Sequence, residues 1–195
     1  MLEEKNKMKK KETELEGVYI IEPDIFYDYR GYFMQSYALN TYLDIDIKNN
    51  FVQDNHAMTL KKGTIRAIHF QNDPHAQAKL VRCTQGRILD IAVDLRKGSP
   101  KFGKWVSVEL SADNFKQIYI PRGFGHGYLT LEDNCEVQYK CDDIYDKQTE
   151  RVLKWNDPTI NIQWGITNPI VSEKDANAPL LDECDINFLF DERIL

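Results

Sequence analysis

A histidine lies within an apolar run typical of a β-strand, Gly63-Thr-Ile-Arg-Ala-Ile-His-Phe-Gln71. Side chains alternate along a strand, so one face is expected to carry Ile65, Ala67, His69 and Gln71. Imidazole gains and loses a proton near neutral pH, which makes His69 a candidate general base. A histidine and a glutamine beside small apolar residues suit a barrel interior that contains water. For this strand taken alone, a hydrogen-bonded core histidine is the alternative interpretation.

A lysine and an aspartate in neighbouring runs suggest a buried charge pair. Lys79 begins the run Lys79-Leu-Val-Arg82, and Asp90 interrupts the apolar run Ile88–Leu95. A carboxylate in so apolar a strand is costly to bury unless it is paired. Lys79 is therefore the candidate partner of Asp90, and a solvated strand face is the alternative.

The run Ile120-Pro-Arg-Gly-Phe-Gly-His-Gly-Tyr128 places three glycines and a proline around His126. Such a turn brings the backbone close to another group. Its Pro-x-Gly-x-x-His pattern resembles the second motif of the cupin superfamily. The first cupin motif needs a His-x-His pair, but the matching site is His69-Phe-Gln71, and glutamine is a poor metal ligand. The sequence therefore predicts a cupin barrel without a metal ion.

Ten short apolar or alternating runs are the predicted strands that position these groups. They follow one another at intervals typical of a β-sandwich or jelly roll, with turns between them. Helical periodicity is weak, and one short helix is expected at Asn40–Leu43. We predict an all-β fold, a cupin-type antiparallel β-sandwich or jelly-roll barrel with few short helices. The predicted strands are Val18–Ile21, Gly31–Tyr37, Phe51–Asn55, Thr64–Phe70, Lys79–Cys83, Ile88–Leu95, Trp105–Leu110, Gln117–Ile120, His126–Leu131 and Glu136–Lys140.

Length and composition describe an ordinary globular protein. The 195 residues, 42% hydrophobic and 29% charged, predict a single domain over residues 15–195 after a flexible charged N-terminus over residues 1–14. The net charge of −6 weighs against nucleic acid and a membrane surface as partners. No apolar run is long enough to span a bilayer. The four cysteines form no C-x-x-C pair, so a zinc knuckle is not expected. Nothing in the sequence indicates secretion, so reduced thiols and a cytoplasmic location are expected.

Eight ordered segments together resemble the dTDP-4-dehydrorhamnose 3,5-epimerase family, the metal-free cupins of nucleotide-sugar biosynthesis. The likeness extends from about Leu15 to Leu181, nearly the whole chain. It implies an epimerase that inverts C3 and C5 of dTDP-4-dehydro-6-deoxy-D-glucose, giving dTDP-4-dehydro-L-rhamnose. It also implies a homodimer, with a strand near Gly17–Ile21 contributing to the partner's sheet. The segments are Asp28–Phe33, Phe51–Asn55, Ile65–Gln71, Lys79–Arg82, Asp90–Arg96, Ile120–Gly127, Glu136–Lys140 and Val171–Asp175.

The resemblance implies a role for each residue of proton transfer. His69 is the base that removes a hydrogen beside the 4-keto group, and Asp175 accepts the other ring N–H and fixes the tautomer. Tyr139 is the acid on the opposite face of the sugar. Lys79 stabilises the enolate oxygen and is itself held by Asp90. Neither a redox cofactor nor a metal is implied.

The resemblance also implies eleven substrate-binding positions. Arginine suits the diphosphate because its planar guanidinium binds two oxygens at once, and Tyr145 is expected to stack on the thymine ring. Strand alternation places Arg66 and His69 on opposite faces, so either a β-bulge or a contribution to a different pocket is expected. The positions are Arg30, Phe33, Gln35, Gln53, Asn55, Arg66, Gln71, His126, Tyr145, Glu150 and Lys174.

Departures from the family's pattern keep other substrates open. Ala67 stands where the family usually has Gly, Gln35 stands where it usually has Glu, and His56-Ala-Met-Thr replaces a more serine-rich stretch. The first alternative is a sibling epimerase that inverts C3, C5 or both in another dTDP- or GDP-linked 4-keto sugar. A second is a catalytically silent cupin that binds sugar nucleotides. A metal-dependent cupin oxygenase or isomerase is disfavoured by the missing ligands.

Overall fold

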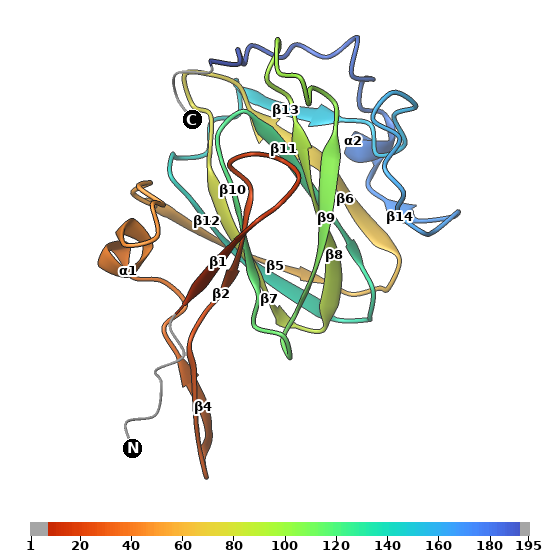
Figure 1. Cartoon of the computed structure of the whole chain (residues 1–195). Helices are drawn as coiled ribbons and strands as arrows, with labels where there is room; N and C mark the ends of the chain where they lie inside the picture. Colours follow the sequence, from red (N-terminus) through yellow and green to blue (C-terminus); the bar gives the residue numbers. More distant parts are fainter. Residues whose placement is uncertain (1–7, 192–195) are drawn as a thin grey trace.

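Two sheets face each other and form a jelly-roll barrel in the computed structural model, which describes residues 8–191 (Figure 1). The first sheet has six strands in the order β1-β2-β10-β7-β12-β5. The second has the order β13-β6-β11-β8-β9, and β14 pairs in parallel with β6 at its edge. The first sheet contains β1 (Lys9–Glu12), β2 (Tyr19–Glu22), β10 (Gln117–Ile120), β7 (Lys79–Gln85), β12 (Cys135–Cys141) and β5 (Gln53–Thr59). The second contains β13 (Glu150–Leu153), β6 (Thr64–Gln71), β11 (Phe124–Thr130), β8 (Arg87–Asp94), β9 (Trp105–Ser111) and β14 (Ile170–Val171).

A two-stranded hairpin extends away from the barrel (Figure 1). It consists of β3 (Ile25–Asp28) and β4 (Gly31–Met34). The two helices are short, α1 (Leu39–Leu43) after the hairpin and α2 (Glu173–Ala176) after β14. Ser172 caps α2, because its hydroxyl accepts the backbone N–H of Asp175.

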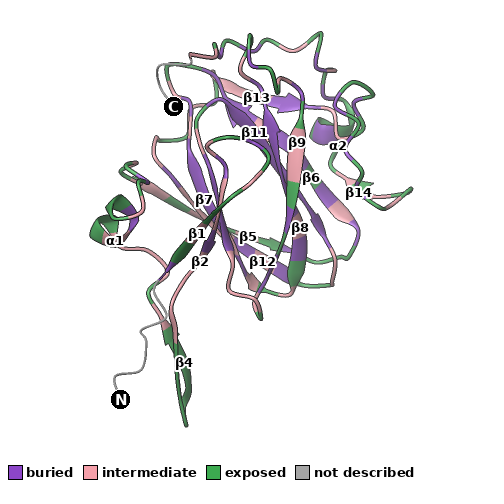
Figure 2. Ribbon diagram, viewed as in Figure 1, coloured by how far each residue is buried: buried purple, intermediate pink, exposed green. Residues whose placement is uncertain are grey.

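The apolar core lies on both sides of the second sheet, whose strands are largely buried (Figure 2). On β8, Ala92 packs with Val81 and Val137 of the first sheet. Its neighbour Ile91 packs on the other side, in a cluster with Trp164 of the C-terminal segment. Because both faces of β8 are covered, this strand has no solvated face, and the alternative of an exposed strand for Asp90 is wrong.

The predicted fold class is confirmed, and each of the ten predicted strands overlaps a strand of the structure. The predicted helix at Asn40–Leu43 corresponds to α1. The sequence prediction missed β1, β3, β13, β14 and α2. These elements have only two to four residues each, too few to show a period of 2 or 3.6.

The N-terminal region differs from its prediction in two ways. Residues 1–7 lie outside the described part of the chain, but Lys9–Glu12 form β1 within the segment expected to be flexible. This strand pairs with β2, which covers most of the segment expected to join a partner's sheet. Since β2 has β1 on one side and β10 on the other, both its edges are already paired within this chain.

A β-bulge in β6 determines which of its side chains face the barrel interior. His126 of β11 pairs with His69 and Tyr128 pairs with Arg66, so two steps on β11 match three on β6. The extra residue reverses the alternation, and the expected shared face of Ile65 and His69 is wrong. Ile65 also borders the cavity that Arg66 and His69 line, but it packs in one apolar cluster with Ile68, the residue next to His69.

Gly127 lies opposite the bulge and allows it to form. A Cβ atom at this position would lie 2.7 Å from the carbonyl oxygen of Arg66 and 2.9 Å from a methyl group of Ile68. Only a residue without a side chain lets the two strands approach this closely. The glycine-rich run before Tyr128 therefore contacts β6, as the sequence predicts for a turn of this type.

Candidate active site

A cavity of about 750 Å³ lies between the two sheets and collects most of the predicted site residues. Four of the sixteen lie elsewhere: Asp90 is buried behind the cavity wall, and Arg30, Phe33 and Gln35 lie on or after the hairpin. The predicted residues that line the cavity are Gln53, Asn55, Arg66, His69, Gln71, Lys79, His126, Tyr139, Tyr145, Glu150, Lys174 and Asp175.

His69 and Asp175 form a dyad at the wall made by β6 and α2. His69 Nε2 lies 3.1 Å from Asp175 Oδ1, and the Asp175 side chain is only 5% exposed. The other carboxylate oxygen accepts the backbone N–H of Ala67 at 3.0 Å, a donor in the bulged part of β6. Burial by itself raises the pKa of Asp175, but the His69 ring, the Ala67 N–H and Ser172 outweigh it and hold this pKa below its ordinary value.

The second ring nitrogen of His69 faces a different carboxylate. Glu150 Oε1 lies 3.8 Å from His69 Nδ1 and 2.8 Å from Lys174 Nζ. The other oxygen of Glu150 accepts the hydroxyl of Tyr145 at 3.0 Å. Burial raises the pKa of Glu150, but its contacts with Lys174 and Tyr145 lower this pKa by more. The pKa of Glu150 therefore lies below its ordinary value. His69 therefore lies between two carboxylates, one held by buried backbone contacts and one held by the exposed side chains of Lys174 and Tyr145.

Lys79 brings a buried ammonium group to the cavity. Its residue is 8% exposed, and Nζ donates to the backbone carbonyl of His69 at 3.3 Å. Burial lowers the pKa of Lys79, against the attraction of Cys141, Asp90 and Glu150. An incompletely neutralised cation in such a place interacts strongly with negative charge that develops nearby.

Asp90 pairs with His126 and not with Lys79, so the expected pairing of Lys79 with Asp90 is wrong. Asp90 Oδ2 lies 2.9 Å from His126 Nε2, and both side chains are buried, with exposures of 0% and 7%. The two residues lie on adjacent strands of one sheet, with Asp90 on β8 and His126 on β11. Lys79 lies on the facing sheet, so Asp90 acts on it only as a charge at longer range.

Tyr139 lines the cavity from β12, in the sheet that faces His69. Its ring lies 6.0 Å from Lys79 Nζ and its centroid 6.4 Å from that of His126. Burial raises the pKa of Tyr139 to about 12. The phenol is therefore held in its protonated form at neutral pH, with a proton available to a group in the cavity.

Two of the predicted substrate-binding residues hold a loop at the cavity. The Gln71 amide donates to the carbonyls of His75 and Ile144 and accepts the N–H of Asp146. Gln53 accepts the backbone N–H of Tyr145 at 2.8 Å. These side chains use their polar groups to fix the loop that carries Tyr145 at the cavity rim.

Three predicted site residues are not brought to this cavity. Arg30 pairs with Asp28 at 2.6 Å on the hairpin, and Phe33 is 69% exposed. Gln35 follows β4 and accepts the hydroxyl of Thr41. The hairpin extends outward, so within one chain these residues and the dyad are separate (Figure 1).

The sequence prediction missed contributions from Ala67, Ser172 and Tyr128. Ala67 and Ser172 hold Asp175 through hydrogen bonds that involve main-chain groups, which no side-chain pattern reveals. Tyr128 is buried in the cavity wall, with its ring 6.2 Å from that of His126. Its place two residues after His126 on the same strand could have indicated this position.

Two further observations concern the described part of the chain. No group of three or more His, Cys, Asp or Glu side chains among residues 8–191 is arranged to hold a metal ion. Within the same residues, no helix is long and apolar enough to cross a membrane.

Known proteins share both the sequence and the shape of this chain. The profile of the dTDP-4-dehydrorhamnose 3,5-epimerase family matches residues 12–183. A dTDP-4-dehydrorhamnose 3,5-epimerase of Shigella flexneri is 47% identical over 174 residues, which cover 89% of this chain and 96% of that protein. The crystal structure of a 3,5-epimerase from Legionella pneumophila with dTDP-4-keto-L-rhamnose has a TM-score of 0.87 at 39% identity, covering 91% of this chain and 95% of that one. A 3'-monoepimerase of Streptomyces bikiniensis with dTDP-quinovose has a TM-score of 0.81 at 32% identity, covering 87% and 86%.

Proposed function

The chain belongs to the dTDP-4-dehydrorhamnose 3,5-epimerase family of isomerases, and we propose that it inverts C3 and C5 of dTDP-4-dehydro-6-deoxy-D-glucose by way of an enolate. The observation that carries this proposal is the placement of His69 and Tyr139 on facing sheets, in the walls of one cavity. A sugar ring between them meets a base on one face and an acid on the other.

The stereochemistry of the substrate fits a single base. The hydrogens on C3 and C5 of a gluco-configured ring lie on the same face, and both carbons are next to the 4-keto group. His69 is therefore able to remove either hydrogen from one side, and Tyr139 returns a proton from the other side. Asp175 keeps the imidazole in one tautomer and favours its protonated form after each abstraction.

Lys79 is the group proposed to stabilise the enolate oxygen. Its ammonium is buried, so it is weakly hydrated and its field is not screened by bulk water. Charge that develops on the 4-keto oxygen during abstraction strengthens this contact, which lowers the barrier more than it strengthens substrate binding.

Groups at the rim are proposed to hold the nucleotide. Arg66 donates to the hydroxyl of Thr59 and the carbonyl of Met58, which are neutral acceptors and leave its charge available to a diphosphate. Tyr145 is 53% exposed at the same opening, where its ring offers a surface for a base. We propose that Arg66 binds the diphosphate and Tyr145 stacks on thymine.

A homodimer is the proposed assembly, with the hairpin as its contact. Five aromatic residues on this hairpin are more than half exposed, and a two-stranded hairpin with such a surface is not expected to be stable in water alone. We propose that the hairpin packs on a second copy and carries Arg30 and Phe33 to its cavity. The exposed residues are Phe26, Tyr27, Tyr29, Tyr32 and Phe33.

We propose a cytoplasmic location, which the four free cysteines support. A related 3'-monoepimerase has the same fold, so inversion at a single carbon is the second candidate function.

Incubation with dTDP-4-dehydro-6-deoxy-D-glucose in D2O tests the proposal. We expect NMR to show deuterium at both C3 and C5 of a product with the ring configuration of 4-dehydro-L-rhamnose. Deuterium and inversion at C3 alone would support the second candidate. No exchange at either carbon would overturn both.

A further inference from the structure

Two inversions in one binding event require the acid and the base to be reset between them, whereas a single inversion does not. Each inversion leaves His69 with one proton more and Tyr139 with one proton fewer. Before a second inversion in the same binding event, His69 must lose its proton and Tyr139 must regain one. The reaction therefore needs a proton sink on one side of the sugar and a proton source on the other.

The two sides of the cavity differ in how easily each proton carrier gives up or regains its proton. The His69 side chain is 31% exposed, so it is able to pass its proton to solvent directly. Tyr139 is also partly exposed, but burial raises its pKa to about 12, which makes the phenolate costly to maintain beside the His126 ring. A bound sugar covers this side further, which favours a proton source within the protein.

The Asp90–His126 pair is the buried group that best fits such a proton source. The His126 ring centroid is 6.4 Å from that of Tyr139, and the carboxylate of Asp90 is 2.9 Å behind His126. One proton lies between the imidazole of His126 and the carboxyl group of Asp90. Asp90 Oδ1 has no hydrogen-bond partner among the described residues, so the contact of Oδ2 with His126 is the hydrogen bond of this buried carboxyl group, and Lys79 acts on it only at longer range.

We propose that the Asp90–His126 pair returns a proton to Tyr139 between the two inversions, an inference that rests on the proposed double epimerisation. The proton moves from the imidazolium of His126 to the Tyr139 phenolate, directly or through one water molecule. The products are neutral His126 and a neutral phenol. His126 regains its proton from solvent when the product leaves and the cavity opens.

Lys79 is a second candidate proton donor near Tyr139, with Nζ 6.0 Å from the centre of the tyrosine ring. Its hydrogen bond, however, goes to the carbonyl of His69, on the base side of the cavity. A lysine that gives up its proton there would also lose its hold on the enolate oxygen. His126 has no such second task in the proposed mechanism, so its proton is the one free to move.

The test is the ratio of singly to doubly inverted product released early, with substrate in excess. Wild-type enzyme is expected to release mainly doubly inverted sugar nucleotide. In His126→Gln and in the isosteric Asp90→Asn, we expect the first inversion to continue and the ratio to rise by about tenfold or more, since the second needs a reloaded acid. NMR in D2O identifies which carbons have been inverted and carry deuterium.

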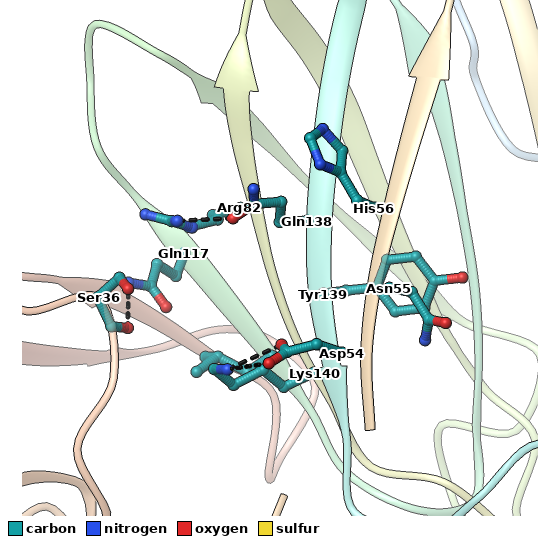
Figure 3. A pocket seen from close by; sticks show the side chains of 10 residues that line it. Ser36, Asp54, Asn55, His56, Arg82, Gln117, Gln138, Tyr139 and Lys140 are labelled. Atoms are coloured by element: carbon teal, nitrogen blue, oxygen red, sulfur yellow. Dashed lines mark hydrogen bonds and ion pairs between the residues drawn. The ribbon is translucent and has the colours of Figure 1, made fainter. Parts of the chain in front are cut away.

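His56→Gln is the matched control. His56 Nε2 lies 2.9 Å from Glu136 Oε2, a pair of the same kind, but the ring is 51% exposed. It lines a smaller hollow that Tyr139 also borders and that contains the Arg82–Gln138 and Lys140–Asp54 contacts, so the control histidine belongs to the same neighbourhood but not to the buried pair (Figure 3). This variant should keep the wild-type product ratio.

The outcomes separate the relay from other roles. Thermal melting and dTDP binding first establish which variants fold, and Asp90→Asn decides the question if His126→Gln does not fold. An equal loss of both inversions would show that the pair only supports the structure or binds substrate, and would overturn the relay. A raised ratio in Lys79→Met but not in the pair variants would assign the relay to Lys79. A wild-type enzyme that inverts one carbon only would instead refute the proposed function itself.

Discussion

His69 Nε2 lies 3.1 Å from one oxygen of Asp175, while the other oxygen of that carboxylate accepts the backbone N–H of Ala67, two residues before the histidine. One strand therefore supplies both the ring and the anchor that orients its partner. Any change in the path of β6 moves the two together, so their distance is preserved while their position in the cavity shifts.

Replacing His69 by alanine should abolish deuterium exchange at both C3 and C5. The base is needed for each abstraction, and its loss is expected to slow turnover by about 10²–10⁴-fold or more. Affinity for dTDP should stay close to that of wild type, because His69 does not contact the diphosphate in the proposed mechanism. Calorimetry with dTDP and a thermal melt provide the control. A variant that fails to fold would favour a core role for this histidine.

Asp175→Asn should slow exchange and also change how stability depends on pH. The pKa of Asp175 is held below its ordinary value of 3.8, so the folded state favours the carboxylate. This contribution to stability is complete above the unfolded pKa and is lost as pH falls through the folded pKa. Urea unfolding at about pH 7, 5 and 3 should therefore show the wild-type advantage shrinking at the lowest pH. An advantage that is constant or grows on acidification would contradict this assignment.

Tyr139→Phe should separate proton removal from inversion. His69 remains able to remove a proton and return it from the same side, so some deuterium exchange should persist. Inversion requires a donor on the opposite face, and phenylalanine has no hydroxyl group. Inverted product is expected to fall by about 10²-fold, the lower end of the usual effect of a general acid, because water in the cavity partly substitutes. Inversion at the wild-type rate would show that another group is the acid.

Gly127→Ala should damage the site without touching a proposed catalytic group. The added methyl group would lie 2.7 Å from the Arg66 carbonyl and would force β11 away from the bulge. We expect a loss of stability of about 1–3 kcal/mol, measured by urea unfolding, together with slower exchange at both carbons. Unchanged stability and activity would mean that the bulge does not depend on this close contact.

Mixing two inactive variants provides a test of the proposed dimer contact. In a dimer of His69→Ala with Arg30→Ala, one cavity keeps its base and receives the intact Arg30 of the other chain. Random reassortment makes half the dimers mixed with one competent site each, so activity should recover to about a quarter of the wild-type value. Each variant mixed with itself is the control. No recovery, despite dimers detected by light scattering, would place Arg30 outside the partner's site.

The strands of the barrel follow from their own residues, because alternation and turn spacing are local properties. The partner of Asp90 does not, since it depends on which strands become neighbours. Pairing places His126 beside Asp90 in one sheet, whereas Lys79 lies across the barrel. An ionisable group on an adjacent strand is closer than one on the facing sheet, which is why Asp90 pairs with His126.

The sequence left open whether a β-bulge or a separate pocket would reconcile the positions of Arg66 and His69. That depends on β11, where Gly127 leaves room for it. The backbone donor of Ala67 and the cap of Ser172 were likewise invisible, because main-chain N–H groups are common to nearly every residue type. The roles of Gln53 and Gln71 in holding the Tyr145 loop required the folded loop to be seen.

The bulge in β6 also makes the strand sensitive to residue count in a way that a substitution does not reveal. Loss of one residue between Arg66 and His69 would take out the bulge, so that two steps on β6 match two on β11 and both side chains still face the cavity. What such a deletion would take away is the main-chain N–H that the bulged part of the strand offers to Asp175. A single-codon deletion here should therefore leave the barrel paired while it loosens the hold on the Asp175 carboxylate.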